Sequence, residues 1–400
     1  VLGTALLAIA DSSGRVYGTI TTVDGDTYTG LIRWDRNEAS WVDILDGTKE
    51  RTRSHAERSR KKYRDRERSI EIFGVKIGSS NVSWGDSYAS QSGIRMGHLK
   101  TLEAIDDDKA MLTLKSGEQI EFTGGSTDIG NDVREIIMED NHEGEIEFVW
   151  SDIDRIDFAE APSDVSSNFG QRLYGTVTSR RGDTYTGFVA WDVDEALGND
   201  ILDGEEKDRG RKIKFDKIAS IERYSSNGAT VTLKTGESML LRGTNDVNDE
   251  NRGIIVGDPG FGQVVIPWDE FDKVEFTSSY KPVTYNDFKP STPLYGTVTT
   301  EDGTKYTGQI RWDDDEEYTW ELLNGEYHDI QFEMELGLVK LIEKRSYRSS
   351  DVTTLDGRTF RLRGSNDVDE DNKGIFIQTG SGDEVEVDWE DFAKVEFAKK

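Results

Sequence analysis

Two loops dense in oxygen-bearing side chains are the part of this sequence best suited to metal chemistry. They read Asn-Asp-Val-Asn-Asp-Glu-Asn at 245–251 and Asn-Asp-Val-Asp-Glu-Asp-Asn at 366–372. Carboxylate and amide oxygens at this density are the hard ligands that calcium prefers. The candidate ligands are Asp246, Asn248, Asp249, Asp367, Asp369 and Asp371. The alternative is a polar turn in which the Asx side chains bond only their own backbone. A looser copy at 117–138 keeps Asp128 and Asp132, and a calcium site there is expected to be weaker.

A basic segment at 49–69 is the second candidate site. It holds ten Lys or Arg residues and four acids, in a chain whose formal net charge is -30. Such a segment predicts an electrostatic contact with an acidic face of another copy, an anionic envelope surface or a polyanion. The residues expected to make this contact are Arg58, Arg60, Lys61, Lys62 and Arg64. The alternative is a solvated helix or loop.

The tryptophans divide into two groups by their position in the sequence pattern. Trp34, Trp191 and Trp312 occupy the inward parity of an alternating segment, which predicts core packing. Trp41, Trp84 and Trp320 lie in less regular sequence. These three are the candidates for a protein contact or a carbohydrate platform, because an aromatic face stacks on sugar rings.

Catalytic chemistry has no support in the residue types. The absence of cysteine excludes disulfides, zinc-thiolate sites and thiol nucleophiles. The four histidines are scattered, and no G-x-S-x-G, Walker or H-E-x-x-H motif occurs. We therefore expect no enzyme and no cofactor other than calcium. The strongly acidic charge also makes nucleic acid an unfavourable partner.

The elements that carry these residues recur three times along the chain. The segment VYGTITTVDGDTYTGLIRWD at 16–35 returns with few changes at 173–192 and 294–313. A closing segment at 149–158 returns at 266–276 and 387–397. These repeats predict three tandem modules. Their bounds are 11–158, 173–276 and 293–400, with linkers at 159–172 and 277–292 and an insertion at about 50–92 in the first module.

Each module has the pattern of short strands. In the segment 184–191, every second residue from Tyr185 to Trp191 falls on one face, and the segment 305–312 repeats this pattern from Tyr306 to Trp312. A period of two residues indicates a strand with one buried face. Asp24-Gly25 and Asp302-Gly303 between alternating runs predict hairpin turns. Regularly spaced short strands predict an all-β fold, a small barrel or sandwich in each module, or two half-barrels per module.

One pattern resembles a known family. Val177, Gly182, Tyr185, Gly187 and Val189 are similar to the first motif of Sm-like small β-barrels, and Leu241-Arg242-Gly243 and Leu362-Arg363-Gly364 are similar to the second. The resemblance implies strongly bent strands in a small barrel. It also implies an RNA-binding role, which conflicts with the acidic charge.

The first ten residues are apolar and small and end in Ala8-Ile9-Ala10, as at the end of a signal peptide. A short terminal strand or helix is the alternative. The sequence predicts a secreted, periplasmic or cell-surface protein without a transmembrane span. Its expected function is a non-catalytic binding or self-assembling scaffold. Calcium-dependent recognition of a glycan or protein is the first alternative, and Sm-like RNA binding is the second.

Overall fold

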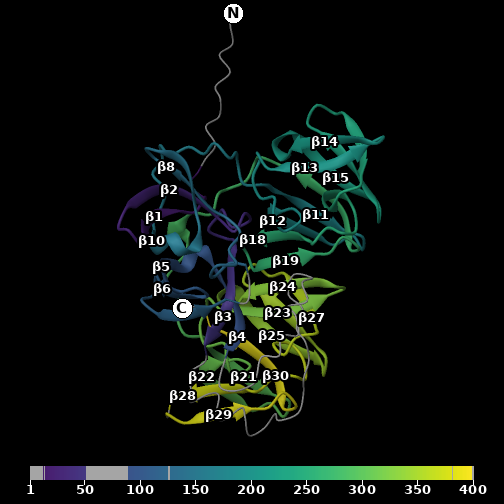
Figure 1. Ribbon diagram of the computed structural model, residues 1–400. Coiled ribbons are helices and arrows are strands. Elements are labelled where there is room, and N and C mark those ends of the chain that lie inside the picture. Colours follow the sequence, from purple (N-terminus) through teal and green to yellow (C-terminus); the bar gives the residue numbers. More distant parts are fainter. Residues whose placement is uncertain (1–11, 13, 51–88, 125–126, 381, 399–400) are drawn as a thin grey trace, which may run out of the picture.

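The computed structural model describes residues 12, 14–50, 89–124, 127–380 and 382–398. Within these residues the chain forms thirty β-strands and six short 3-10 helices, in three antiparallel sheets of 10, 12 and 8 strands (Figure 1). The all-β prediction is therefore confirmed. The apolar segment at 1–10 and most of the insertion at about 50–92 lie outside the described residues. In the described part of the chain, no helix has the length and apolarity that a membrane span requires.

The first sheet contains β1 (Tyr17–Thr22), β2 (Thr27–Trp34), β3 (Ile44–Glu50), β4 (Ala89–Arg95), β5 (Leu99–Asp106), β6 (Lys109–Leu114), β7 (Gln119–Thr123), β8 (Ile136–Asp140), β9 (Gly144–Phe148) and β10 (Ile153–Phe158). The second sheet contains β11 (Tyr174–Ser179), β12 (Thr184–Ala190), β13 (Ile201–Glu206), β14 (Arg209–Lys214), β15 (Ile218–Ser225), β16 (Gly228–Leu233), β17 (Ser238–Arg242), β18 (Ile254–Asp258), β19 (Gly262–Ile266), β23 (Leu322–Tyr327) and β24 (Ile330–Glu335), together with β20 (Phe271–Phe276). The third sheet contains β21 (Tyr295–Thr300), β22 (Lys305–Arg311), β25 (Val339–Ser346), β26 (Ser349–Thr354), β27 (Thr359–Leu362), β28 (Ile375–Thr379), β29 (Glu384–Val387) and β30 (Phe392–Phe397). The 3-10 helices are η1 (Met96–His98), η2 (Trp150–Asp152), η3 (Phe215–Lys217), η4 (Asn245–Val247), η5 (Tyr285–Asp287) and η6 (Leu336–Leu338).

The three sheets follow one strand order. It runs β3-β7-β6-β5-β10-β1-β2-β8-β9 in the first sheet and β13-β17-β16-β15-β20-β11-β12-β18-β19 in the second. The third sheet runs β27-β26-β25-β30-β21-β22-β28-β29. The repeated sequence segments therefore occupy corresponding strands. No described strand pairing joins the two ends of a sheet, so each sheet is open rather than a closed barrel.

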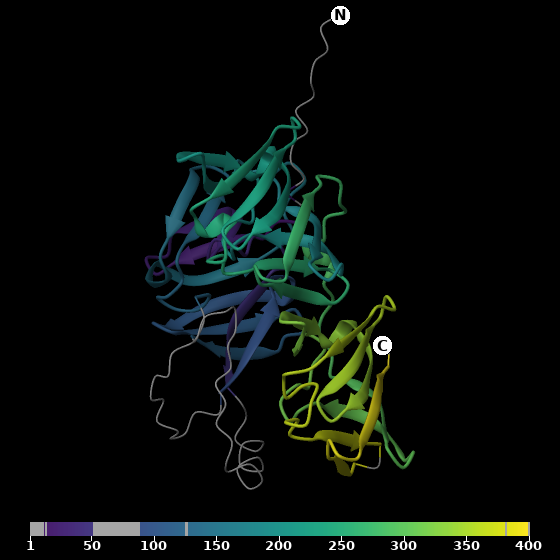
Figure 2. The same cartoon turned by 90° about the vertical axis from the view of Figure 1, so that its right-hand side faces the viewer.

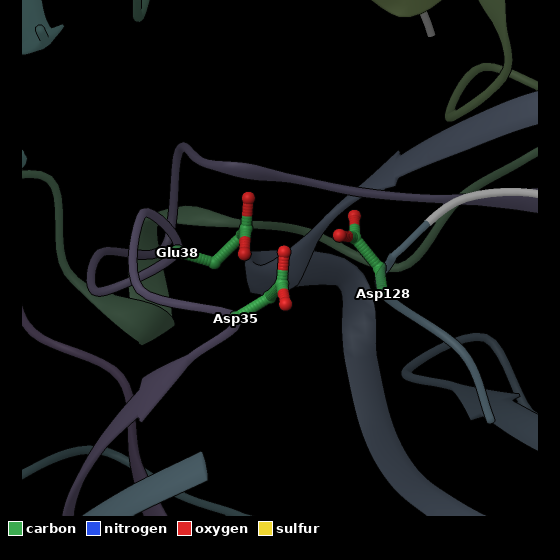
Figure 3. A group of neighbouring side chains, drawn as sticks. All are labelled: Asp35, Glu38 and Asp128. Carbon is green, nitrogen blue, oxygen red and sulfur yellow. The ribbon is translucent and has the colours of Figure 1, made fainter. Parts of the chain in front are cut away.

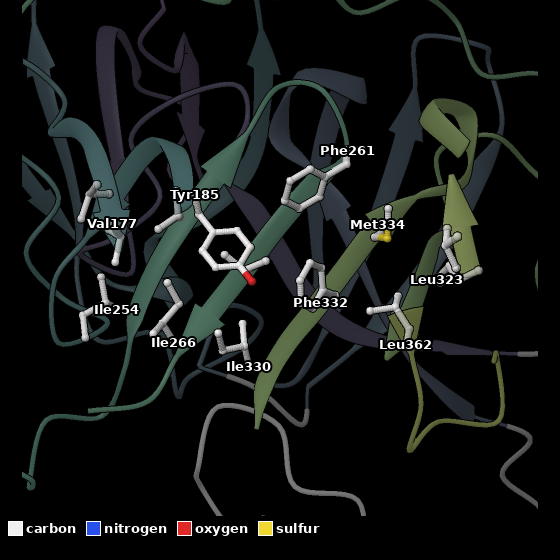
Figure 4. Packing of buried hydrophobic residues seen from close by; sticks show 14 of the residues in the cluster. Val177, Tyr185, Ile254, Phe261, Ile266, Leu323, Ile330, Phe332, Met334 and Leu362 are labelled. Atoms are coloured by element: carbon white, nitrogen blue, oxygen red, sulfur yellow. The ribbon is translucent and has the colours of Figure 1, made fainter. Parts of the chain in front are cut away.

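The hairpin β23–β24 connects the second and third sheets. Strand β24 pairs antiparallel with β19 at the edge of the second sheet, and β23 touches the third sheet through an isolated bridge between Glu326 and Arg363. Phe261, Phe332 and Met334 lie over this joint (Figure 4). The second and third sheets consequently share one hydrophobic core.

Glycines allow the strands of the repeated segment to approach very closely. A Cβ at Gly30 would lie 1.9 Å from the main-chain oxygen of Glu139 on the neighbouring strand β8. The corresponding distances are 2.3 Å at Gly187 and 2.1 Å at Gly308, again to main-chain oxygens. Only glycine fits there, which is the physical basis of the repeated glycine. The predicted hairpin turn is also confirmed, because Gly25 has a φ of 87° and joins β1 to β2.

The sheets contact one another through buried groups from distant parts of the chain. Arg172, in the linker at 159–172, forms a buried ion pair with Asp43 at 2.9 Å. Trp320, in the segment before β23, enters the core of the first sheet. Tyr285, in the linker at 277–292, packs at a tilt against Trp41 with ring centroids 4.6 Å apart. Figure 1 shows the first sheet at the left, the second at the upper right and the third below them, and Figure 2, seen from the right, shows the third sheet at the lower right.

Candidate metal sites: three carboxylate triads

A tight loop at the end of β2 begins the site. Asp35 and Arg36 have φ values of 41° and 76°, in the left-handed region. The chain then returns, and the main-chain groups of Trp34 and Glu38 bond each other at 2.8 and 3.1 Å. The loops at 191–195 and 312–316 repeat this geometry, with left-handed residues at Asp192, Val193, Asp313 and Asp314. A β-branched residue such as Val193 rarely adopts this conformation, so the loop stores strain of a kind often found at functional sites.

Each loop brings its Asp and Glu side chains beside a third carboxylate from a distant segment. Asp128 approaches Asp35 and Glu38, with one oxygen of each residue within 4.8 Å of the others (Figure 3). All three side chains are buried. The same grouping occurs three times, as Asp35–Glu38–Asp128, Asp192–Glu195–Asp246 and Asp313–Glu316–Asp367. We refer to these groups as the carboxylate triads.

A tryptophan and a main-chain amide hold the third carboxylate in position. Trp34 Nε1 donates to the main-chain oxygen of Asp128 at 2.9 Å, and Asp128 Oδ2 accepts from the amide of Asp46 at 2.7 Å. The second and third triads have the same bonds at 2.6–3.0 Å, from Trp191 and Trp312 and from the amides of Asp203 and Asn324. The predicted core tryptophans are buried as expected. Their indole nitrogens also position the triads.

One basic residue accompanies each triad. Arg134 contacts Asp35 at 2.7 Å, Arg252 contacts Asp192 at 3.0 Å, and Lys373 contacts Asp313 at 3.0 Å. The main-chain amide of the same basic residue also donates to that Asp. When the three carboxylates are ionised, each triad and its cation carry two uncompensated negative charges.

The glutamate of each triad has an oxygen without a partner. Within the described residues, Oε2 of Glu38, Glu195 and Glu316 is buried and accepts no hydrogen bond. Glu38 as a whole is only 2 % exposed. A buried carboxylate oxygen without a donor carries a large desolvation cost, and natural structures rarely leave one unsatisfied. The same atom is unsatisfied in all three copies, which indicates a shared cause.

The electrostatics of the triads favour an additional positive charge. Burial, and then the charges of neighbouring carboxylates, raise the pKa of Glu195 to about 9 and the pKa of Glu38 well above its ordinary value. Burial also raises the pKa to about 7 at Asp128 and Asp367 and to about 6 at Asp246. A proton or a metal cation would relieve this repulsion.

The structure divides the predicted calcium ligands between two environments. Asp246 and Asp367 belong to triads. Asn248 and Asp369 bond the backbone two residues onward, at 2.8 and 3.0 Å, as Asx turns do. Asp249 is exposed, and neither it nor Asp371 belongs to a carboxylate cluster among the described residues. Each of the loops at 245–251 and 366–372 therefore supplies one carboxylate to a triad. Asn248 and Asp369 form the polar turns that were the alternative prediction.

The other members of the triads were not predicted from the sequence. They lie in a repeated Trp-Asp-x-x-Glu motif at 34–38, 191–195 and 312–316, directly after the strand that was recognised. The sequence predicts a weaker calcium site at Asp128, because its loop holds fewer acids, yet Asp128 belongs to a triad like its counterparts. The recurrence of this motif beside the tryptophan was the available signal.

The structure describes two of the predicted partner-binding residues. Trp41 and Trp320 are buried, packed within the chain rather than exposed to a ligand. Trp320 Nε1 donates to Glu118 at 3.3 Å, and the Lys49 ammonium lies 5.5 Å from its ring. Trp84 and the basic residues Arg58, Arg60, Lys61, Lys62 and Arg64 lie outside the described residues.

No family model, curated protein or solved structure matches this chain.

Proposed function

We propose that the chain is a non-catalytic β scaffold that acts outside the cytoplasm, and that each carboxylate triad takes up one calcium ion. The observation that carries the proposal is the buried, unsatisfied Oε2 of Glu38, Glu195 and Glu316. A cation beside these atoms satisfies them and offsets the remaining charge of the triad. It also links the loop after β2, β12 or β22 to the distant segment that contributes the third carboxylate.

Calcium is the preferred ion because of the donor set. The triads offer carboxylate oxygens only, whereas zinc sites favour nitrogen and sulfur. Calcium accepts irregular geometry and completes its coordination with water or main-chain oxygens, while magnesium demands a near-ideal octahedron. Calcium sites of extracellular modules have Kd values of about 10⁻⁴–10⁻³ M, so a role outside the cytoplasm fits weak structural sites.

The burial of the triads supports a structural role over catalysis. Asp35 and Asp128 are buried and held by Arg134, Trp34 and backbone amides, so a substrate could not approach them without opening the fold. The ion would add stability by mass action, about 2.7 kcal/mol for each site at a calcium concentration 100 times Kd.

Terbium luminescence tests the proposal directly. Terbium replaces calcium at oxygen sites, and Trp34, Trp191 and Trp312 are close enough to sensitise its emission. We expect three terbium ions per chain, displaced by calcium, and a higher melting midpoint in calcium than in chelator. Glu38→Gln should reduce the stoichiometry to two. The control Asp249→Asn changes an exposed acid outside the triads and should retain three.

The absence of sensitised emission together with an unchanged melting midpoint at millimolar calcium would refute the proposal. So would full stoichiometry in Glu38→Gln. In either case the triads would be carboxyl groups that share protons.

A further inference from the structure

The joint between β19 and β24 shows how one repeat of this chain accepts a strand from another. The two strands pair antiparallel, with Gln263 opposite Glu333 and Val264 opposite Phe332. Gln263 Nε2 donates to Glu333 Oε2 at 2.5 Å. Every residue of β19 is buried. The joint is therefore a complete example of strand addition at a sheet edge.

The counterparts of both strands lie at sheet ends elsewhere in the molecule. Strand β9 is the counterpart of β19 and ends the first sheet. Strand β14 is the counterpart of β24 and ends the second sheet. The hairpins β13–β14 and β23–β24 even share a left-handed two-residue turn, at Lys207–Asp208 and His328–Asp329. Among the described strands, two donor-type strands, β4 and β14, and two acceptor-type strands, β9 and β29, end a sheet. Residues 93–95 of β4 are buried, and Glu384 of β29 already contacts Arg311, so β14 and β9 are the edges most open to a partner.

Exposure distinguishes the unpaired edges from the paired ones. All residues of β14 except Ile213 are exposed, whereas β24 is mostly buried. In β9, Gly144, Glu145 and Glu147 are exposed, in contrast to the fully buried β19. Exposed strand edges with unsatisfied main-chain groups are templates for pairing with another chain.

The two edges carry opposite charges. Strand β14 reads Arg-Gly-Arg-Lys-Ile-Lys, four basic residues in a strongly acidic protein. Strand β9 reads Gly-Glu-Ile-Glu-Phe and directly follows Glu143. The existing ion pairs Arg211–Glu206 and Lys212–Asp203 lie at the surface and are therefore weak competitors. Charge complementarity favours pairing of a β14 edge with a β9 edge.

We propose that β14 of one copy pairs antiparallel with β9 of a second copy, in the register of the β24–β19 joint. Transferring that register places Lys212 opposite Glu145 and Arg211 opposite Ile146. In Figure 1, β8, which pairs with β9, is labelled at the upper left and β14 at the upper right. The contact is heterologous, so its repetition joins successive copies into a ring or an open chain. Because Arg211 and Ile213 replace the Phe332 and Met334 of the internal joint, the contact is more polar and more sensitive to salt.

Sedimentation velocity of the full chain at 20 mM and 500 mM NaCl tests the proposal. We expect oligomers that grow with protein concentration at low salt and dissociate at high salt. Arg211→Glu/Lys212→Glu should be monomeric, and so should Glu145→Lys/Glu147→Lys. An equimolar mixture of these two variants should associate again, because each then offers an edge complementary to the other.

The control Lys217→Glu/Lys234→Glu makes the same change in charge at exposed positions outside β14, and it should associate like the natural chain. Because the altered side chains are exposed, unchanged circular dichroism will confirm that the variants fold. A natural chain that stays monomeric at low salt would overturn the proposal. Association that survives both reversals, or a mixture that stays monomeric, would do so as well.

Discussion

Replacement of Gly262 by alanine should separate the second and third sheets. Gly262 is the first residue of β19 and has a φ of 143°. A Cβ there would lie 1.9 Å from the main-chain oxygen of Glu333 on β24. The backbone fixes the position of the Cβ, and the oxygen it meets belongs to the backbone of Glu333, so no side-chain rotation relieves the clash. Strand β24 must move away from β19, and the hydrogen bonds between them weaken.

The size of the effect follows from the lost bonds and the added strain. Left-handed or glycine-only backbone costs alanine about 1–3 kcal/mol. Loss of two or three main-chain hydrogen bonds adds about 1 kcal/mol each. We therefore expect Gly262→Ala to lower the free energy of unfolding by about 3–6 kcal/mol.

Gly144, the counterpart of Gly262 in β9, is the matched control. It also has a positive φ, 86°, but a Cβ there meets nothing within 4 Å. Gly144→Ala should show the backbone strain alone, about 1–2 kcal/mol. Hydrogen exchange should locate the difference, with protection lost in β24 and β19 of Gly262→Ala only. Equal destabilisation by the two substitutions, with β24 still protected, would refute the reasoning.

Three further predictions concern contacts between the sheets. Trp320→Ala should lower the free energy of unfolding, measured by urea denaturation, by about 3–5 kcal/mol, because a fully buried indole is removed from the core of the first sheet. A loss below about 1 kcal/mol would contradict this packing. Arg172→Ala leaves Asp43 buried without its cation and should lower the free energy of unfolding by about 3–5 kcal/mol. Arg155→Ala removes a more exposed ion pair and should lower it by less than about 1 kcal/mol. Equal losses of stability would show that burial does not govern the strength of the Arg172–Asp43 pair. Burial, and then the neighbouring carboxylate of Glu321, raise the pKa of Glu118 from 4.5 to about 7. The folded protein therefore favours the protonated form of Glu118, and stability is lost as the pH rises from 4.5 to about 7. Glu118→Gln should therefore be more stable than the natural chain by about 1 kcal/mol at pH 8, after allowance for partial exposure, and no more stable at pH 4; thermal melting at both pH values checks the sign.

Part of the candidate site could be predicted because it is local. The Asx-rich loops pointed to Asp246 and Asp367, which belong to triads. The Trp-Asp-x-x-Glu motif was visible in all three copies, and its loop geometry depends on neighbouring residues only. The convergence of Glu38 with Asp128 was not visible, because these residues are 90 positions apart and meet only through strand pairing.

The amino-acid sequence was sufficient for the features that depend on neighbouring residues. The alternation of side chains specifies strands, Asp24-Gly25 specifies a hairpin turn, and the parity of Trp34, Trp191 and Trp312 specifies burial. Each of these follows from steric and solvation effects that act within a few residues.

The path of the hairpin β23–β24 and the burial of Trp41 and Trp320 depended on the packed molecule instead. Nothing in the local pattern of β24 shows that its outer edge pairs with β19 of another repeat, whereas its counterpart β14 ends a sheet. That choice is made by the total apolar surface and main-chain hydrogen bonding that the assembled sheets bury, which is a property of the whole fold.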